Sequence, residues 1–141
     1  LSLRFDPSLT MTLGPEMEMT LQRAIELAPR NPRPRLLDAM STLHKPEFVG
    51  GGAEKALAKF KQAQELFESE TSSDSLGPDW GRVEATIWAG RSALKLGDHA
   101  AARGFYEQAL RLEPGNGWVR QVLLPELEKA AAAKAGGKNG S

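Results

Sequence analysis

The chain has 141 residues, a length that suits a single domain. Eighteen basic and eighteen acidic side chains cancel, so the composition does not indicate a protein that binds nucleic acid or a membrane surface. Cysteine is absent, which excludes a disulfide framework, a cysteine-based zinc site and a thiol nucleophile. No window approaches 18 uninterrupted apolar residues, which excludes a spanning helix.

The first clear helix is predicted to begin at Pro15 and to end before Pro29. Proline suits the first position of a helix and cannot continue one. Met17 and Leu21 recur at helical spacing, which gives this helix one apolar face. Residues 1–13, which precede it, show no decisive pattern.

A second helix is predicted after Asn31, which suits the N-cap and is followed by a proline, and it stops before Pro46. Three glycines at 50–52 predict a flexible joint. They also suggest a phosphate-binding loop, but no strand precedes them and no Lys-Ser/Thr pair follows at the required spacing. A third helix is predicted from Ala53 to about Glu68.

Residues 69–79 read as a polar, turn-rich loop. Two helices follow at about 80–96 and 98–113, and they are separated by Gly97, a helix terminator, and Asp98, a cap. Together with the earlier helices, this pattern predicts an all-α fold, because no segment alternates apolar and polar residues as a strand does.

The last predicted helix covers about residues 117–134. Asn116 is placed to cap it, and Pro125 is expected to kink or divide it. The remaining residues, 135–141, are expected to form a flexible tail.

Residues 83–116 carry small, aromatic and turn residues at fixed offsets: Gly90, Gly97, Asp98, Ala102, Tyr106, Ala109 and Pro114. In this spacing the segment resembles a tetratricopeptide repeat over all 34 of its positions. Small residues at 90, 102 and 109 would let two antiparallel helices approach closely, and Tyr106 would fill the gap between neighbouring pairs. The segment departs from the family at Thr86 and Ala93, where aromatic residues are usual, and Trp88 is expected to supply the missing bulk as a core residue. The alternative is that Trp80, Trp88 and Trp118 line a recognition site, because tryptophan is favoured at the energetic centres of interfaces.

The resemblance implies a short α-solenoid of antiparallel helix pairs with a C-terminal capping helix, in one domain over residues 1–134. Its parts would be a partial repeat (about 1–31), an irregular repeat (about 32–68), the loop 69–79, a full repeat (83–116) and the capping helix (117–134). Ala24 and Ala63 stand 39 residues apart, five more than one repeat, and the segment from Lys45 to Gly51 is the expected place for this insertion. The arrangement is also similar to bacterial tetratricopeptide proteins of poorly assigned function, many of them exported, which implies a periplasmic or exported location rather than a cytoplasmic one.

Stacked helix pairs make concave binding surfaces, so the resemblance implies a protein that binds another protein or a peptide. The family's inner surface comes from the first helix of each pair, which here gives the groove residues Arg33, Leu36, Met40, Glu84, Ile87, Arg91 and Lys95, with Leu43, His44 and Leu94 beside them. An apolar centre with cations around it is suited to an extended or helical segment that carries a carboxylate. The alternative is a structural module that self-associates or stacks with a larger repeat protein.

Motifs of enzymes are missing: the chain has no GxGxxG, GxxxxGK[ST], GxSxG or HExxH. His44 and His99 fall in different repeats, so no metal site is predicted and no cofactor is implied. We therefore expect a protein that is not an enzyme. Gly104 lies in the middle of a helix, where glycine costs about 1 kcal/mol relative to alanine, and a close contact between helices is the one role that the sequence suggests for it.

Overall fold

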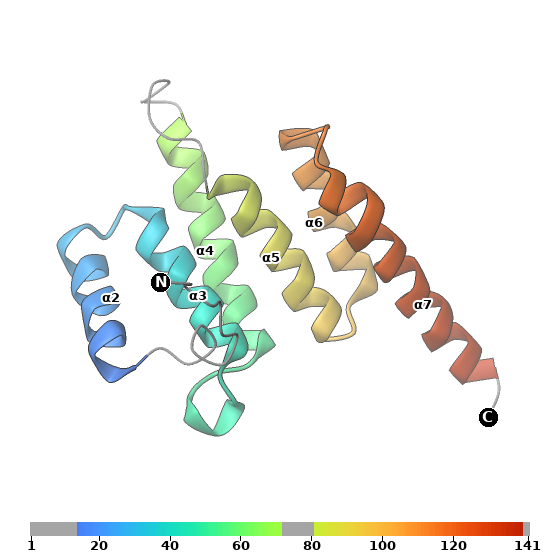
Figure 1. Ribbon diagram of the computed structural model, residues 1–141, viewed down its shortest axis with the longest axis horizontal. Coiled ribbons are helices and arrows are strands. Elements are labelled where there is room, and N and C mark those ends of the chain that lie inside the picture. The colour runs from blue at the N-terminus through green and yellow to red at the C-terminus, as the bar shows by residue number, and fades with distance from the viewer. Residues whose placement is uncertain (1–13, 72–80, 140–141) are drawn as a thin grey trace, which may run out of the picture.

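The computed structural model of the protein describes residues 14–71 and 81–139, and within these ranges it contains helices and no strand. Figure 1 shows the helices lying side by side from one end of the molecule to the other. In chain order the elements are α2 (Pro15–Leu27), α3 (Pro32–His44), η1 (Glu47–Val49), α4 (Ala53–Thr71), α5 (Arg82–Lys95), α6 (His99–Leu112), η2 (Val119–Leu123) and α7 (Leu124–Asn139). The predicted all-α fold is confirmed, and none of these helices is both long and apolar enough to cross a membrane.

The helices pack in sequential order. Helix α3 packs on α4 and α5 on α6, while α4 also packs on α5 and so joins the two pairs. At one end α2 lies against α3, and at the other η2 and α7 lie against α6 (Figure 1). Each helix therefore contacts mainly its neighbours in the chain, as in a short helical solenoid.

Three helices begin at the caps that the sequence predicts. The side chain of Asn31 accepts a hydrogen bond of 3.1 Å from a backbone N–H in the first turn of α3. Asp98 does the same for α6 and Asn116 for the C-terminal helix, each at 3.0 Å. These bonds satisfy N–H groups that have no partner within the helix, so the boundaries are set by local chemistry.

The core has two hydrophobic clusters. One lies among α3, α4 and α5 and contains Phe60, and the other lies among α5, α6 and the C-terminal helix and contains Tyr106. Many of the buried residues are small: Ala39, Ala56, Ala63, Ala85, Ala89, Gly90, Ala102 and Ala109. Small side chains let neighbouring helices approach closely, and the aromatic rings fill the remaining space.

Gly90 is a close fit between α5 and α6. A Cβ atom built there would lie 2.6 Å from Cε1 of Tyr106 and 3.1 Å from Cβ of Phe105. Gly104 is different, because it is exposed and a Cβ atom there would have no neighbour within 4 Å. The predicted close contact at Gly104 is therefore wrong, whereas Gly90 fits the role expected of it.

Thr86 takes a polar role where the family usually has an aromatic side chain. Its hydroxyl accepts a hydrogen bond of 2.9 Å from the amide of Gln64 and donates one of 3.1 Å to the carbonyl of Arg82. A buried polar pair thus links α4 and α5. Trp88 was expected to be a core residue, but it is half-buried, and only part of it packs against the first cluster.

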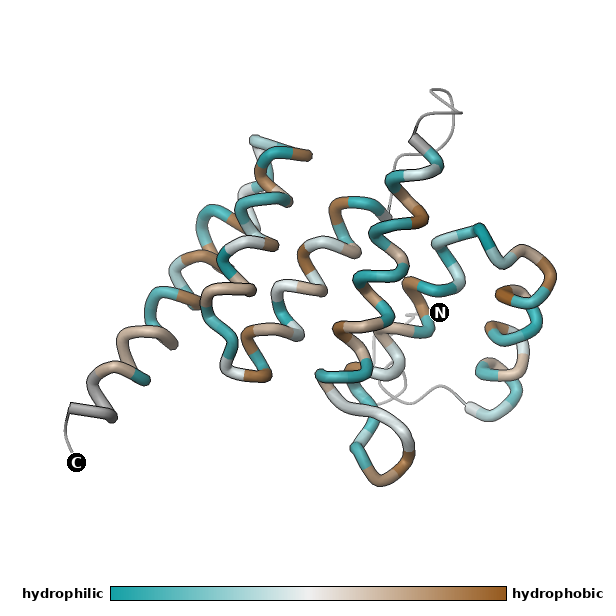
Figure 2. Tube along the Cα trace, turned by 180° about the vertical axis from the view of Figure 1, so that it is seen from behind, coloured by the Kyte–Doolittle hydropathy of each residue, from teal (hydrophilic) through white to brown (hydrophobic). Residues whose placement is uncertain are grey.

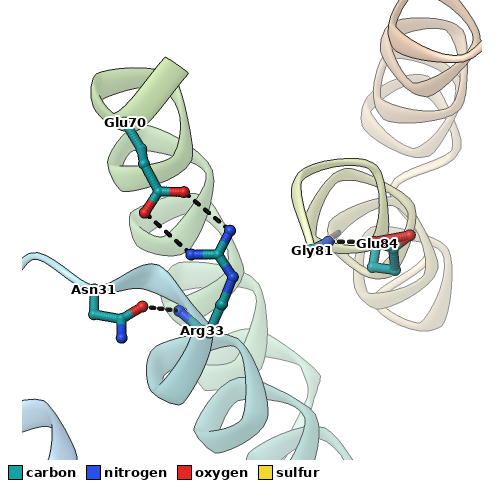
Figure 3. Close-up of polar contacts among 5 residues, drawn as sticks. All are labelled: Asn31, Arg33, Glu70, Gly81 and Glu84. Carbon is teal, nitrogen blue, oxygen red and sulfur yellow. Dashed lines mark hydrogen bonds and ion pairs between the residues drawn. The ribbon is translucent and has the colours of Figure 1, made fainter. Parts of the chain in front are cut away.

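Helix α4 continues three residues beyond its predicted end, so residues 69–71 are helical rather than part of a loop. The Arg33 guanidinium forms contacts of 3.0 and 3.1 Å with the two carboxylate oxygens of Glu70, and this pair holds the last turn of α4 to α3 (Figure 3). The remainder of the predicted loop, Trp80 and residues 1–13 lie outside the described residues.

The C-terminal helix runs without interruption from residue 117 to Asn139. Residues 135–139 are therefore helical rather than a flexible tail, and they continue a helix in which residues 130–133 are alanines, which favour a helix. Residues 140 and 141 of the predicted tail lie outside the described residues. Pro125 does not end the helix. The residues before it form the π-helical segment η2, in which the N–H of Leu124 bonds to the carbonyl of Val119, and this wider turn accommodates a ring that would clash in a regular helix.

We predict that Gly90→Ala destabilises the protein relative to Gly104→Ala. Both changes replace a glycine inside a helix with alanine, so both carry the same intrinsic gain of about 1 kcal/mol. Only the new methyl group at position 90 meets the Tyr106 ring, and overpacking of this kind costs about 1–3 kcal/mol. The two free energies of unfolding, measured by urea denaturation, should differ by that cost.

Gly104→Ala thus acts as the matched control, and on its own it should stabilise the protein. Equal free energies of unfolding for the two variants would show that α5 and α6 do not approach as closely as described.

Candidate functional site

A pocket of about 300 Å³ opens between the end of α3, the second half of α5 and the beginning of α7. Its lining residues are Leu43, His44, Trp88, Arg91, Leu94, Lys95 and Glu126. The pocket thus combines apolar and aromatic surface with two permanent cations and one carboxylate. We call these seven residues the inner pocket.

Helix α5 contributes the residues that give the inner pocket its chemistry. Trp88, Arg91 and Lys95 stand three and four residues apart, and this spacing brings them to one face of the helix. The opposite side of α5 carries the small buried residues that pack on α4 and α6. Helix α5 therefore buries its small side chains on one face and places its large side chains on the other, where they line the pocket.

Three aromatic rings form a row along the pocket. The centroids of His44 and Trp88 are 6.1 Å apart, and those of Trp88 and Trp118 are 6.2 Å apart, both in edge-on arrangements. Such distances and angles are favourable between aromatic rings. Trp118, on the first turn of the C-terminal helix, remains 41% exposed, so the row has an accessible end.

The Arg91 guanidinium lies over this row. Its central carbon is 4.9 Å from the centroid of Trp88 and 5.3 Å from that of Trp118. Cation–π contacts at these distances are attractive and hold the guanidinium in place. Within the described residues no carboxylate forms an ion pair with Arg91 or with the exposed Lys95. The charges of both cations are therefore available to a ligand.

His44 has a defined orientation. Its Nδ1 lies 2.9 Å from the carbonyl oxygen of Met40, and because a carbonyl only accepts, Nδ1 carries the hydrogen. The other ring nitrogen is then left to interact with solvent or a ligand.

Tyr106 belongs to the second core cluster, against which Leu94 of the pocket packs. Its side chain is fully buried, its hydroxyl has no hydrogen-bond partner among the described residues, and burial raises its pKa to about 12. The charges of Arg91, which lowers this pKa, and Glu126, which raises it, act on the same hydroxyl.

The structure separates the seven groove residues that the sequence predicts. Arg91 and Lys95 line the inner pocket, with Leu43, His44 and Leu94 beside them. Leu36 and Ile87 are only 2% exposed and belong to the core clusters, and Met40 is half-buried against the first of them.

The two other predicted groove residues have structural partners (Figure 3). Arg33 pairs with Glu70 of α4, and its guanidinium lies 5.4 Å from the ring centroid of Phe67. The carboxylate of Glu84 accepts a hydrogen bond from the backbone N–H of Gly81 and so caps α5. Both side chains therefore form contacts at the ends of helices and do not line the inner pocket.

Sequence reasoning missed Glu126 as a residue of the pocket, whereas Trp118 was among the tryptophans suggested for a recognition site. Both come from the C-terminal helix, which the sequence otherwise predicts to be a cap. The signal that was available is the spacing of Trp88 with the two cations, which argues for an exposed tryptophan. Among the described residues, no group of three histidine or acidic side chains is placed to hold a metal ion.

The paired antiparallel helices and their inner pocket define a helical repeat protein. The family model of the tetratricopeptide repeat matches residues 83–116, so this segment, which comprises α5 and α6, is a tetratricopeptide repeat. Searches of curated proteins and of solved structures find no match. Tetratricopeptide repeats are generally non-catalytic interaction modules, so the match suggests a protein–protein interaction role for this segment.

We expect the raised pKa of Tyr106 to make the protein less stable as the pH rises from 10 to about 12. The unfolded chain releases the phenol proton near the ordinary value of 10.0, whereas the folded chain keeps it until about 12. In this window the unfolded state binds fewer protons, so rising pH favours unfolding. The chain has one tyrosine, so the tyrosinate absorbance of the native protein reports this group alone.

Tyr106→Phe is the control, because it removes the hydroxyl and keeps the ring. The variant should have an equal or higher free energy of unfolding at pH 7, by up to about 1 kcal/mol, since the lost hydroxyl has no partner among the described residues. It should also lose less stability than the wild type between pH 10 and 12. Native titration with a midpoint near 10 would contradict the burial of this phenol.

Proposed function

We propose that the protein is a non-catalytic scaffold that binds a peptide or protein segment in its inner pocket. The proposal rests on the tetratricopeptide repeat and on one observation in particular. Two cations without ion-pair partners among the described residues, Arg91 and Lys95, stand beside accessible tryptophan surface. Arginine and tryptophan are the side chains that most often dominate binding energy at protein interfaces.

The chemistry of the pocket specifies the segment. Trp88, Leu43 and Leu94 offer apolar surface to an aromatic or aliphatic side chain. Arg91 and Lys95 outnumber the single acid Glu126, so the pocket favours a ligand group with negative charge. A segment with a carboxylate next to an apolar side chain satisfies both requirements.

Arg91 has the larger role of the two cations. Its guanidinium is half-buried and held by two rings, so little side-chain entropy is lost when it pairs with a carboxylate. Lys95 is exposed, and solvent screens its charge. We therefore propose that Arg91 anchors the ligand and that Lys95 adds long-range attraction.

Selection from a random displayed-peptide library should enrich acidic residues next to aromatic or aliphatic ones. The affinity of a selected peptide, measured by fluorescence anisotropy, should fall at least about tenfold in the Arg91→Glu, Lys95→Glu double variant, a loss of about 1.4 kcal/mol or more. Lys95→Glu alone should show a smaller loss, which keeps the test valid if the double variant folds poorly.

The matched control is Lys55→Glu with Lys61→Glu. These exposed lysines lie on α4, which contributes no residue to the inner pocket, and their reversal changes the net charge by the same amount. The control should bind like the wild type. Selected peptides without acidic residues, or equal losses in both double variants, would refute the assignment of the pocket.

A further inference from the structure

The segment between α3 and α4 protrudes beyond the ends of both helices (Figure 1) and carries hydrophobic residues (Figure 2). Here η1 (Glu47–Val49) holds Phe48, which is 88% exposed, and Val49, which is 53% exposed. Phe48 has the highest exposure among the large hydrophobic residues of the described ranges. We call residues 47–49 the tip.

The tip is held by hydrogen bonds. The N–H groups of Val49 and Gly51 both donate to the carbonyl of Pro46, at 3.2 and 3.0 Å, and that of Gly50 donates to Glu47 at 3.0 Å. The N–H of Gly52 donates to the carbonyl of Thr42, at 2.9 Å, and so ties the segment back to α3.

The three glycines are required by this turn. Gly50 and Gly52 have φ values of 88° and 115°, which other residues rarely adopt, and a Cβ atom on Gly51 would lie 2.2 Å from the carbonyl oxygen of Lys45. The predicted flexible joint is therefore corrected to a bonded turn. The Lys45 ammonium also pairs with Glu18 of α2, which braces the start of the segment.

The tip has the composition that the inner pocket favours. Glu47 supplies a carboxylate, and Phe48 and Val49 supply adjacent aromatic and aliphatic side chains. The high exposure of Phe48 excludes that it fills the pocket of its own chain. Because the bonded turn already fixes the tip, docking it costs less ordering entropy than docking a flexible peptide.

We infer that the tip of one copy docks in the inner pocket of a second copy, with Phe48 against Trp88 and Glu47 paired with Arg91. This inference rests on the proposed function, because it uses the same pocket and gives it a partner. Tip and pocket are different surfaces, so each copy presents both halves of the contact. Association then proceeds either as a reciprocal pair or as a chain of copies.

Sedimentation velocity over a dilution series tests the inference. The wild type should associate with rising concentration, and Phe48→Ser should raise the dissociation constant at least about tenfold. Arg91→Glu should do the same, with Lys95→Glu as a milder substitute that leaves the stacked guanidinium in place. The control is Leu27→Ser, since Leu27 of α2 is 80% exposed but lies outside the tip and the pocket, and this variant should associate like the wild type.

Mixing the two defective variants gives the decisive result. Phe48→Ser keeps an intact pocket and Arg91→Glu keeps an intact tip, so an equimolar mixture should form a species of two copies that neither variant forms alone. Monomeric wild type at all concentrations, unaltered association of Phe48→Ser, or a mixture that stays monomeric would each overturn the inference.

The peptide assay separates this outcome from failure of the proposed function. Phe48→Ser should bind selected acidic peptides at least as tightly as the wild type, because its pocket is intact and no second copy competes. If such peptides bind the pocket while the wild type is monomeric, only the docking of a second copy is refuted.

Discussion

The fit between Gly90 and the ring of Tyr106 is the constraint on which the remaining structure depends. A fully buried ring lies where α5 has no side chain, so the separation of α5 and α6 is set by the thickness of one aromatic group. The same ring belongs to the cluster that includes the C-terminal helix. Leu94 of the inner pocket packs against the same cluster. The packing of the repeat thereby holds the helix that carries Arg91 and Lys95 of the inner pocket.

Small core residues also explain why a tryptophan is accessible. Helix α5 buries Ala85, Ala89 and Ala93 against its neighbours, and an indole does not fit where helices approach so closely. Trp88 therefore remains half-buried at the inner side, where its face supports the Arg91 guanidinium. The protein therefore combines a tightly packed interior with a pocket lined by larger side chains. The second feature follows from the first.

The sequence predicted the features that depend on residues close together in the chain. The caps at Asn31, Asp98 and Asn116 depend on residues a few positions apart, so the helix boundaries that they set were foreseen. The residues of the groove were predicted only in part, because the direction in which a side chain points depends on where the neighbouring helices end. Arg33 pairs with Glu70 because α4 extends to Thr71, beyond the end that the sequence predicts.

The sequence suggested Trp118 for a recognition site but not its ring contact with Trp88, since that contact depends on how the C-terminal helix packs in the fold. The turn at residues 45–52 shows a different limit of sequence reasoning, because three consecutive glycines suit both a flexible joint and a rigid turn. This segment adds no residue to either core cluster, and it exposes a phenylalanine to water, which is unfavourable for an isolated protein. A flexible linker would need neither the specific hydrogen bonds nor the aromatic residue. The hydrogen-bonded turn and its exposed phenylalanine are both explained if Phe48 binds the inner pocket of a second copy, as we infer.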